Sequence, residues 1–339
     1  MVVFPTETVY GLGADAFNAE AVARVYSEKG RPGDNPLILH IASMEDFAQL
    51  AHNPPPYAFA FIEAFWAGPL TLVARKNPTL STWLGGHPYG TTETIGIRMP
   101  SHPVALALIK AAGCAIAAPS ANKSGRPSST TLLHVLDDFP ELHGGNNCNG
   151  MVALDGGCSA VGLESTVVDI TGDAPVILRP GAITVQDIGK ALRTLPLIPH
   201  TGTHPLDSCH LRDRVIPRSP GMKYKHYAPY ADMCLVSGVS ERVAEFILCE
   251  CAKDESRRCG VLVSAETKRL LGGDLPKNLV AIEIGETQEI IAQELFALFR
   301  KLDGYNVNII YAETVPESGL GVAIMDRMKK AAEGRVVYV

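Results

Sequence analysis

The sequence predicts an α/β protein with two domains. The chain of 339 residues is long enough to bury two separate cores. Short apolar runs that fit strands alternate along it with runs that have helical spacing. At Asp232 this alternation becomes regular, as is typical of a parallel sheet. We therefore expect a first domain over residues 1–190, a linker over 191–231 and a smaller second domain over 232–339.

The chain opens with a strand that runs into a polar turn. Met1–Phe4 is apolar, and Pro5 ends the strand because proline has no N–H for the ladder. The turn contains two hydroxyls, a carboxylate and two glycines: Thr6, Thr8, Glu7, Gly11 and Gly13. Polar turns at strand ends are where α/β proteins tend to carry their functional residues.

A helix follows, with Asn18 as its expected N-cap and Gly30 as its expected C-cap. Just past its last turn lie two cations and an amide: Lys29, Arg31 and Asn35. Pro32 and Pro36 stiffen this loop. The pattern favours a clamp for a polyphosphate, although a solvated turn with surface charges would have the same composition.

Three more strands are expected over residues 37–41, 70–75 and 94–100, with helices over 43–51 and 57–66. His40 lies in the first of these strands, where a lone histidine is usually a core residue. Thr94, Gly96 and Arg98 share one face of the third. An arginine inside a strand needs a partner, which could be a carboxylate or phosphate ligand or an internal salt bridge. Ser101 is expected to cap a helix that ends near Gly113.

The small residues of 114–118 form a strand that runs into short polar side chains. Ser120, Asn122, Ser124 and Ser128 follow it directly, in a turn fixed by glycine and prolines. The alternative is a plain Ser/Gly/Pro linker. Ser129 or Thr130 should cap a helix through residue 136. Residues 152–155 and 166–171 are predicted to pair as strands, and a short strand over 176–178 ends at Arg179.

The second domain is predicted to be a small doubly wound parallel sheet. Its strands are expected at 233–236, 260–263, 279–284, 308–312 and 336–339, and its helices near 241–251, 287–302 and 322–332. No glycine fingerprint follows the first of these strands, which argues against a dinucleotide site. Gly319-Leu-Gly321 opens the last helix and could bind an anion, although a structural turn explains it better.

Charge and composition narrow the class of function. Residues 1–185 contain 10 Lys and Arg against 16 Asp and Glu, which accounts for the whole net charge of −6. A cationic pocket inside an acidic domain indicates a small anionic ligand rather than nucleic acid. The eight cysteines include no CxxC pair, and we expect them to be reduced thiols of a cytoplasmic protein. We see no secretory signal and no membrane span.

The strand ends present hydroxyls and cations but no recognised nucleophile. The sequence has no Walker A motif, no GxGxxG and no Ser-His-Asp or Cys-His pattern in its usual local context. Catalysis by positioning and charge neutralisation is therefore expected, as in nucleotidyl or phosphoryl transfer.

These motifs resemble the YrdC-type threonylcarbamoyl-AMP synthases. The resemblance rests on residues 5–13 (PTETVYGLG), Lys29-Gly-Arg31, Asn35-Pro36, Ser120-Ala-Asn122 and Glu164-Ser-Thr166. Residues 219–229 (SPGMKYKHYAP) and 319–324 (GLGVAI) resemble the two-domain form of that family. The resemblance spans nearly the whole chain and implies a twisted mixed-sheet catalytic domain followed by a Rossmann-like parallel domain, with residues 219–229 as a flap on the linker.

The resemblance also implies an activity and a site. The enzyme would join L-threonine, bicarbonate and ATP, carried with Mg²⁺, into threonylcarbamoyl-AMP and release pyrophosphate. A downstream complex would transfer the group to adenosine 37 of ANN-decoding tRNAs, so contact with tRNA would be indirect. By resemblance, L-threonine would be held by Thr8, His40, Arg98, Ser165 and the backbone at Ala118. ATP would be surrounded by Lys29, Arg31, Asn35, Thr94, Ser120, Asn122, Ser128 and Arg179. Tyr227 would close over the nucleotide. The residues expected to act in catalysis are Lys29, Arg31, Ser120 and Asn122, and no residue is expected to bind a metal directly.

Two other functions fit parts of the pattern. One is a carbamoyltransferase that uses carbamoyl-phosphate, although its relatives carry acylphosphatase and zinc-finger modules that this sequence lacks. The other is a non-catalytic RNA-binding module, which the acidic first domain disfavours. Family members usually carry a helix before the first strand, whereas this sequence starts at the strand itself, so we expect that a segment is missing here.

Overall fold

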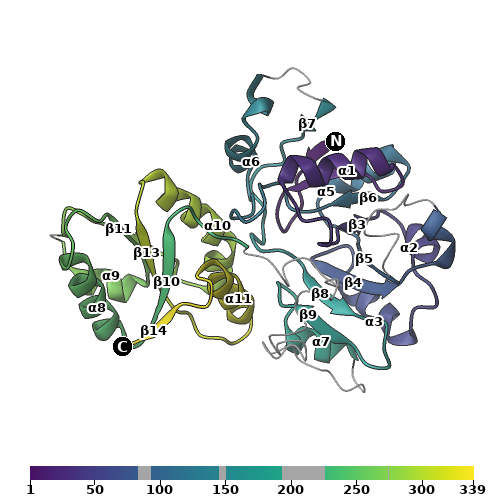
Figure 1. Cartoon of the computed structure of the whole chain (residues 1–339). Helices are drawn as coiled ribbons and strands as arrows, with labels where there is room; N and C mark the ends of the chain where they lie inside the picture. The colour runs from purple at the N-terminus through teal and green to yellow at the C-terminus, as the bar shows by residue number, and fades with distance from the viewer. Residues whose placement is uncertain (83–92, 145–149, 193–225, 274) are drawn as a thin grey trace. The chain divides into compact units, whose positions relative to one another are not determined.

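The computed structural model describes residues 1–82, 93–144, 150–192, 226–273 and 275–339. They form two compact units (Figure 1). The first holds the described residues of 1–124 and 129–192, and the second holds 125–128 and 226–339. The short segment 125–128 groups with the second unit, where Arg126 Nη2 lies 2.8 Å from Asp303 Oδ2 and Arg300 Nη2 donates to the Pro127 carbonyl at 2.6 Å. The linker expected at 191–231 lies largely outside the described residues.

The first unit is built on a nine-stranded mixed sheet. In spatial order its strands are β7 (Val152–Ala153), β1 (Val2–Phe4), β2 (Gly11–Asp15), β6 (Ile116–Ala118), β3 (Ile38–His40), β5 (Thr94–Arg98), β4 (Leu70–Arg75), β8 (Thr166–Asp169) and β9 (Val176–Arg179). β3 runs parallel to β5 and antiparallel to β6. This register places His40 opposite Arg98 on one side and opposite Ile116 on the other.

Among its described residues this unit has six α-helices and two short 3-10 segments, and the longest helix begins after a capped turn. The α-helices are α1 (Ala19–Lys29), α2 (Met44–Leu50), α3 (Pro56–Phe65), α5 (Pro103–Ala112), α6 (Leu132–Asp138) and α7 (Val185–Leu192), and the 3-10 segments are Pro78–Thr82 and Pro140–Gly144. The Asn18 side chain accepts a hydrogen bond from the Ala21 N–H, and Gly30 closes α1 with a φ of 62°. Both caps were predicted, and they fix where the Lys29–Asn35 loop begins.

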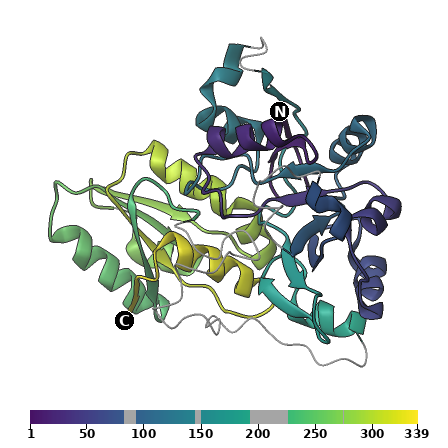
Figure 2. The ribbon, with the colours of Figure 1, turned by 45° about the vertical axis from the view of Figure 1, so that its right-hand side comes forward.

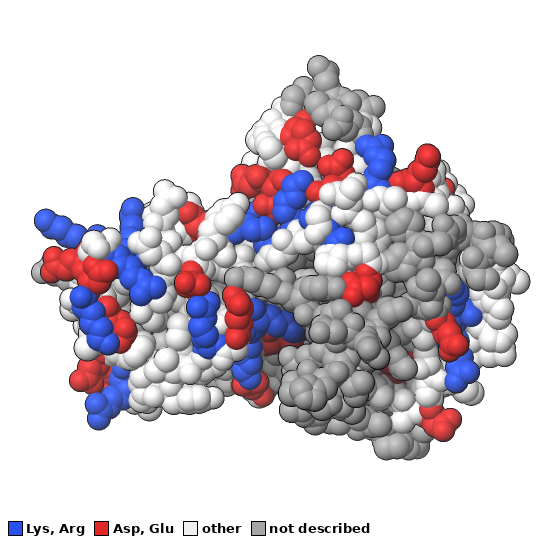
Figure 3. Space-filling view, viewed as in Figure 1, with Lys and Arg blue, Asp and Glu red and all other residues white. Residues whose placement is uncertain are grey.

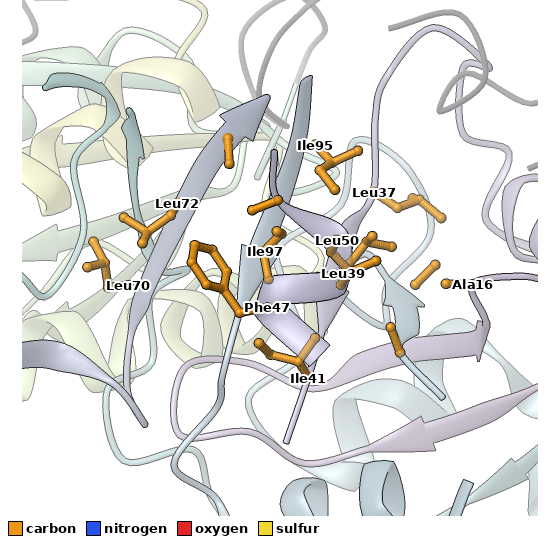
Figure 4. Packing of buried hydrophobic residues seen from close by; sticks show 14 of the residues in the cluster. Ala16, Leu37, Leu39, Ile41, Phe47, Leu50, Leu70, Leu72, Ile95 and Ile97 are labelled. Carbon is orange, nitrogen blue, oxygen red and sulfur yellow. The ribbon is translucent and has the colours of Figure 1, made fainter. Parts of the chain in front are cut away.

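Successive side chains of the strands alternate between a core face and a second face, the functional face, which also carries buried apolar residues such as Val73 and Ile116. Figure 4 shows the core face, where Leu39, Ile41, Ile95, Ile97 and Leu72 pack around Phe47 of α2. The residues between them on the same strands point the other way, because successive side chains of a strand lie on opposite faces. Those intervening residues are Ile38, His40, Thr94, Gly96, Arg98 and Thr71. Three residues predicted for the site, His40, Thr94 and Arg98, are thus brought to one face by the strand alternation.

The second unit is a five-stranded parallel sheet, as predicted. Its order is β12 (Leu279–Glu283), β11 (Cys259–Val263), β13 (Ile309–Glu313), β10 (Asp232–Ser237) and β14 (Val336–Tyr338). In both views α8 (Ser240–Ala252) and α9 (Ala265–Leu271) lie on one side of the sheet (Figure 1 and Figure 2). α10 (Gln288–Gly304) and α11 (Gly321–Ala331) lie on the other. The placement of β13 between β10 and β11 departs from the usual Rossmann strand order.

The structure corrects several local predictions. Residues 152–155 and 166–171 do not pair with each other, because β7 pairs with β1, and β8 pairs with β4 and β9. The helix cap after β5 is His102 rather than Ser101, and the cap of α6 is Thr131 rather than Ser129 or Thr130. Helices α7 and α9 were not predicted.

The segment Gly11–Asp15 is a strand where the sequence indicated only a turn. A Cβ on Gly13 would lie 2.5 Å from Ile116 Cγ2 and 2.8 Å from Phe4 Cε1. Glycine is therefore required here by close packing against the neighbouring side chains, not by a turn conformation.

On the face drawn in Figure 3, Lys and Arg are interspersed with Asp and Glu over both units.

Among the described residues no helix is long and apolar enough to cross a membrane.

Candidate active site

Arg98 is a buried cation of the functional face. It is 4% exposed, and all three of its side-chain nitrogens donate hydrogen bonds. Nη2 donates to Glu7 Oε1 at 2.6 Å, Nη1 to Thr8 Oγ1 at 2.8 Å, and Nε to the Gly68 carbonyl at 3.2 Å. Of the two partners that the sequence allowed, the internal salt bridge is therefore present. It leaves room for a ligand as well, because a guanidinium has five N–H groups.

His40 lies across the strand pair from Arg98 and is buried. Burial, and then the positive charge of Arg98, lower its pKa from 6.5 to about 3. The imidazole is therefore neutral at physiological pH, and its Nδ1 lies 3.2 Å from the Ile38 carbonyl. A neutral ring can donate or accept one hydrogen bond to a substrate without adding charge to the pocket.

Ser165 comes to the same region from the segment before β8. Its Oγ lies 2.7 Å from Thr71 Oγ1 and accepts a hydrogen bond from Arg179 Nη2 at 3.1 Å. Arg179 Nε also donates to the Ser165 carbonyl at 3.0 Å. Arg179 was expected at ATP, and the structure places it directly on a residue expected at L-threonine. It can therefore connect the two predicted subsites.

The loop after α1 is held by its own cations. Lys29 is 3% exposed, and its ammonium donates to the Ser120 carbonyl at 2.5 Å and to the Asn122 carbonyl. Arg31 donates from Nε to the Asn35 carbonyl at 3.0 Å and from Nη2 to the Pro36 carbonyl at 2.8 Å. The two predicted motifs, Lys29–Arg31 and Ser120–Asn122, are thus brought together by direct bonds.

The other residues predicted at ATP have different local environments. Ser120 Oγ donates to Asn122 Oδ1 at 2.5 Å. The side-chain oxygen Oδ1 of Asn35 is buried and has no hydrogen-bond partner among the described residues. A buried polar atom in this condition is unusual and is expected of a group that meets a ligand. Thr94 lies on the same face of β5 as Arg98.

Two predicted ATP residues belong to the second unit. Ser128 is buried within the segment 125–128. Tyr227 is 5% exposed, has a φ of 66°, and stacks on Phe296 with ring centroids 5.4 Å apart. Its closure over a nucleotide stays a prediction.

Ala118 ends β6 on the functional face, next to Gly11. Its side chain is buried in a cluster with Phe4 and Ile109, and a Cβ on Gly11 would lie 3.5 Å from Ala118 Cβ. The expected role of the Ala118 backbone at L-threonine stays a prediction.

Comparison with known proteins identifies the family of the chain. A family model named for Sua5, YciO and YrdC and described as telomere recombination matches residues 1–181, and one for the C-terminal domain of threonylcarbamoyl-AMP synthase matches residues 183–333. The chain belongs to this Sua5/YrdC family.

Individual relatives cover the chain almost completely. The threonylcarbamoyl-AMP synthase of Pyrococcus abyssi is 40% identical over 341 residues, covering 100% of this chain and 92% of the relative. That of Bacillus subtilis is 41% identical over 339 residues, covering 99% and 90%. A crystal structure of P. abyssi Sua5 complexed with L-threonine has a TM-score of 0.83 and 38% identity and covers 100% of this chain and 92% of that one. The predicted family and both domain folds are thereby confirmed.

Sequence reasoning missed three residues of this Sua5-family site: Thr6, Glu7 and Thr71. Glu7 and Thr6 were recognised only as members of a polar turn. Thr71 was missed entirely, since its strand was recognised only as an apolar run. Its position on the functional face of β4, between Leu70 and Leu72 of the core, could have identified it.

Proposed function

We propose that this protein is a nucleotidyltransferase that makes L-threonylcarbamoyl-AMP from L-threonine, bicarbonate and ATP and releases pyrophosphate. The observation that carries the proposal is the match along the full chain to threonylcarbamoyl-AMP synthases. The geometry supports it, because the functional face combines an arginine suited to a carboxylate with a loop of cations and hydroxyls suited to phosphates. The product would serve threonylcarbamoylation of adenosine 37 in ANN-decoding tRNAs through a downstream transferase complex. We place the reaction in the cytoplasm.

In the first half of the reaction the amine of L-threonine reacts with bicarbonate, water leaves, and an N-carboxylate forms. Arg98 would bind the α-carboxylate of threonine. Thr8, Ser165, neutral His40 and the backbone at Ala118 would bind its remaining polar groups. His40 stays uncharged and Glu7 balances the charge of Arg98, so these three side chains carry no net charge before L-threonine binds.

In the second half an oxygen of the N-carboxylate attacks the α-phosphorus of ATP, and the bond to pyrophosphate breaks. Both reactants are anions, so the protein must hold them together and absorb the charge that develops on pyrophosphate. Arg31 would stabilise this charge, with Ser120 and Asn122 on the neighbouring loop. Lys29 would contribute both its charge and its hold on the carbonyls of that loop.

ATP would enter with Mg²⁺ on its phosphates. The predicted ATP residues are cations, hydroxyls and amides, and no group of three or more His, Cys, Asp or Glu in the part of the chain that the structure describes could hold a metal ion. This donor set fits an ion whose shell is completed by phosphate oxygens and water. When bound, Mg²⁺ would neutralise part of the phosphate charge.

Release of pyrophosphate tests the proposal. We expect release from ATP and Mg²⁺ to require both L-threonine and bicarbonate. In Arg31→Ala the turnover number should fall roughly 10²–10³-fold, the usual cost of removing one group that stabilises transition-state charge. Lys110→Ala is the matched control, because Lys110 is an exposed cation on α5 of the same domain, and its activity should equal that of the wild type.

The alternatives give different results in the same assay. Turnover that is driven by carbamoyl-phosphate and indifferent to threonine would replace the proposal with a carbamoyltransferase. A folded protein that releases no pyrophosphate but binds RNA would replace it with a binding module.

A further inference from the structure

Three anchors fix the guanidinium of Arg98 and leave a defined part of it open. Glu7 Oε1, Thr8 Oγ1 and the Gly68 carbonyl accept one N–H each. Two N–H groups remain, one on each terminal nitrogen, and neither has a partner among the described residues. A pair of N–H groups on the two terminal nitrogens is what a carboxylate accepts in a bidentate contact.

The hydrogen bond between Arg98 and Thr8 has a fixed direction. Thr6 has one hydroxyl proton, and its Oγ1 donates to the Val9 carbonyl at 2.6 Å. The contact of 2.9 Å between Thr6 Oγ1 and Thr8 Oγ1 must therefore use the proton of Thr8. As a result Thr8 Oγ1 can only accept from Arg98, and it cannot turn to donate elsewhere.

The Glu7 anchor is the only charged one, and it is itself held in place. Glu7 is 8% exposed, and its second oxygen Oε2 accepts the Ser101 N–H at 3.1 Å. Its backbone carbonyl accepts the Val161 N–H at 2.7 Å. Burial opposes ionisation, but the charge and hydrogen bond of Arg98 and the backbone N–H groups outweigh it, so the pKa of Glu7 lies below its usual value. The side chain is thus a fixed anion at neutral pH.

From these contacts we propose that Glu7 is a positioning residue of the threonine site, which acts by holding Arg98 so that its two open N–H groups face the substrate carboxylate. Glu7 does not touch the substrate itself. The inference deepens the proposed function and rests on it, because it takes L-threonine as the carboxylate that Arg98 receives.

The main test is Glu7→Gln, which keeps the size of the side chain. An amide can accept on one side only, so its NH₂ group must face either Arg98 or the Ser101 N–H, both of which are donors. We expect the KM for L-threonine to rise at least 10-fold, the KM for ATP to stay within 2-fold, and kcat to fall less than KM rises. Asp169→Asn is the matched control, since Asp169 is a 6% exposed carboxylate of the same unit that accepts the N–H and hydroxyl of Thr171. It should leave both KM values unchanged.

A double-mutant cycle separates positioning from a general structural effect. Arg98→Met alone should weaken calorimetric binding of L-threonine strongly, and Glu7→Gln added to it should have no further effect, because Glu7 acts only through Arg98. Additive losses in the double variant would overturn the proposal. So would a KM for threonine in Glu7→Gln that is unchanged or lower than in the wild type.

Glu7→Asp covers the case in which Glu7→Gln does not fold, as judged by thermal unfolding. It keeps the charge but is shorter by one methylene, so it should draw the guanidinium away and also raise the KM for threonine at least several-fold. An unchanged KM would contradict the proposal. If the wild type neither binds L-threonine nor releases pyrophosphate in response to it, the proposed function falls and this inference with it. If the wild type does both and the Glu7 variants match it, only this inference falls.

Discussion

At the level of single residues, the most unusual group is the histidine that stays neutral beside an arginine. The pKa of His40 is about 3 in the folded chain, because of burial first and then the charge of Arg98, while the unfolded chain would have an ordinary value near 6.5. Between these values the unfolded state binds a proton that the folded state does not. Stability therefore falls as the pH falls through this window.

We expect His40 alone to lower the free energy of unfolding by about 2 kcal/mol when the pH falls from 7.5 to 5. His40→Gln should lose that part of the pH dependence, whatever its stability at pH 7.5. Urea unfolding followed by tryptophan fluorescence would measure it, since Trp66 and Trp83 both lie in the first domain by sequence. Glu7 does not interfere, because its lowered pKa moves its own contribution to a window below its ordinary value of 4.5. Equal slopes in the wild type and the variant would show that His40 is protonated in the folded state.

At the level of secondary-structure elements, strand alternation builds the site and glycine keeps it open. Gly96 lies between Thr94 and Arg98 on the functional face of β5. A Cβ there would lie 3.4 Å from Thr71 Cγ2 and 3.6 Å from Ile38 Cγ1, which is ordinary contact. The fold therefore accepts alanine at this position. The absence of a side chain keeps the functional face open above β5.

Gly96→Ala should be as stable as the wild type or more stable by about 0.5–1 kcal/mol, because alanine restricts the unfolded chain. Gly96→Val should fold too but lower kcat/KM at least 10-fold, since its methyl groups enter the functional face. Thermal unfolding and pyrophosphate release would be measured together. Gly189→Ala on α7 is the control, as nothing lies within 4 Å of its Cβ position, and its activity should be unchanged. Full activity in Gly96→Val would show that this part of the face does not border a substrate.

The same elements show what the sequence could reveal. Asn18, Gly30 and the strand alternation that places Arg98 and Thr94 together were predicted, because caps and period-two patterns are local. The pairing of β7 with β1 was missed, because nothing in a two-residue strand indicates a partner about 150 residues away. The Glu7–Arg98 pair was missed for the same reason. The sequence indicated that Arg98 needed a partner, but only the tertiary fold identifies which carboxylate of the chain it is.

At the level of the whole molecule, the two units have different designs. The first brings its polar residues to one face of a mixed sheet from segments far apart in the sequence, as with Glu7, Arg98 and Ser165. The second is an all-parallel sheet with helices on both sides. The charges of residues 186–339 are balanced, with 20 Lys and Arg against 20 Asp and Glu.

This charge distribution predicts that the protein does not hold tRNA firmly by itself. Affinity for nucleic acid comes largely from Lys and Arg that neutralise phosphates, and it falls steeply with salt. The chain has a net charge of −6, and the face in Figure 3 intersperses both signs. We expect a dissociation constant above roughly 10 µM for an ANN-decoding tRNA at about 150 mM salt, the range of non-specific binding. Gel shifts over a salt series, with and without ATP and L-threonine, would measure it. A complex tighter than about 1 µM would mean that a local basic surface outweighs the net charge, and that tRNA is a direct partner of this protein, independent of a downstream transferase.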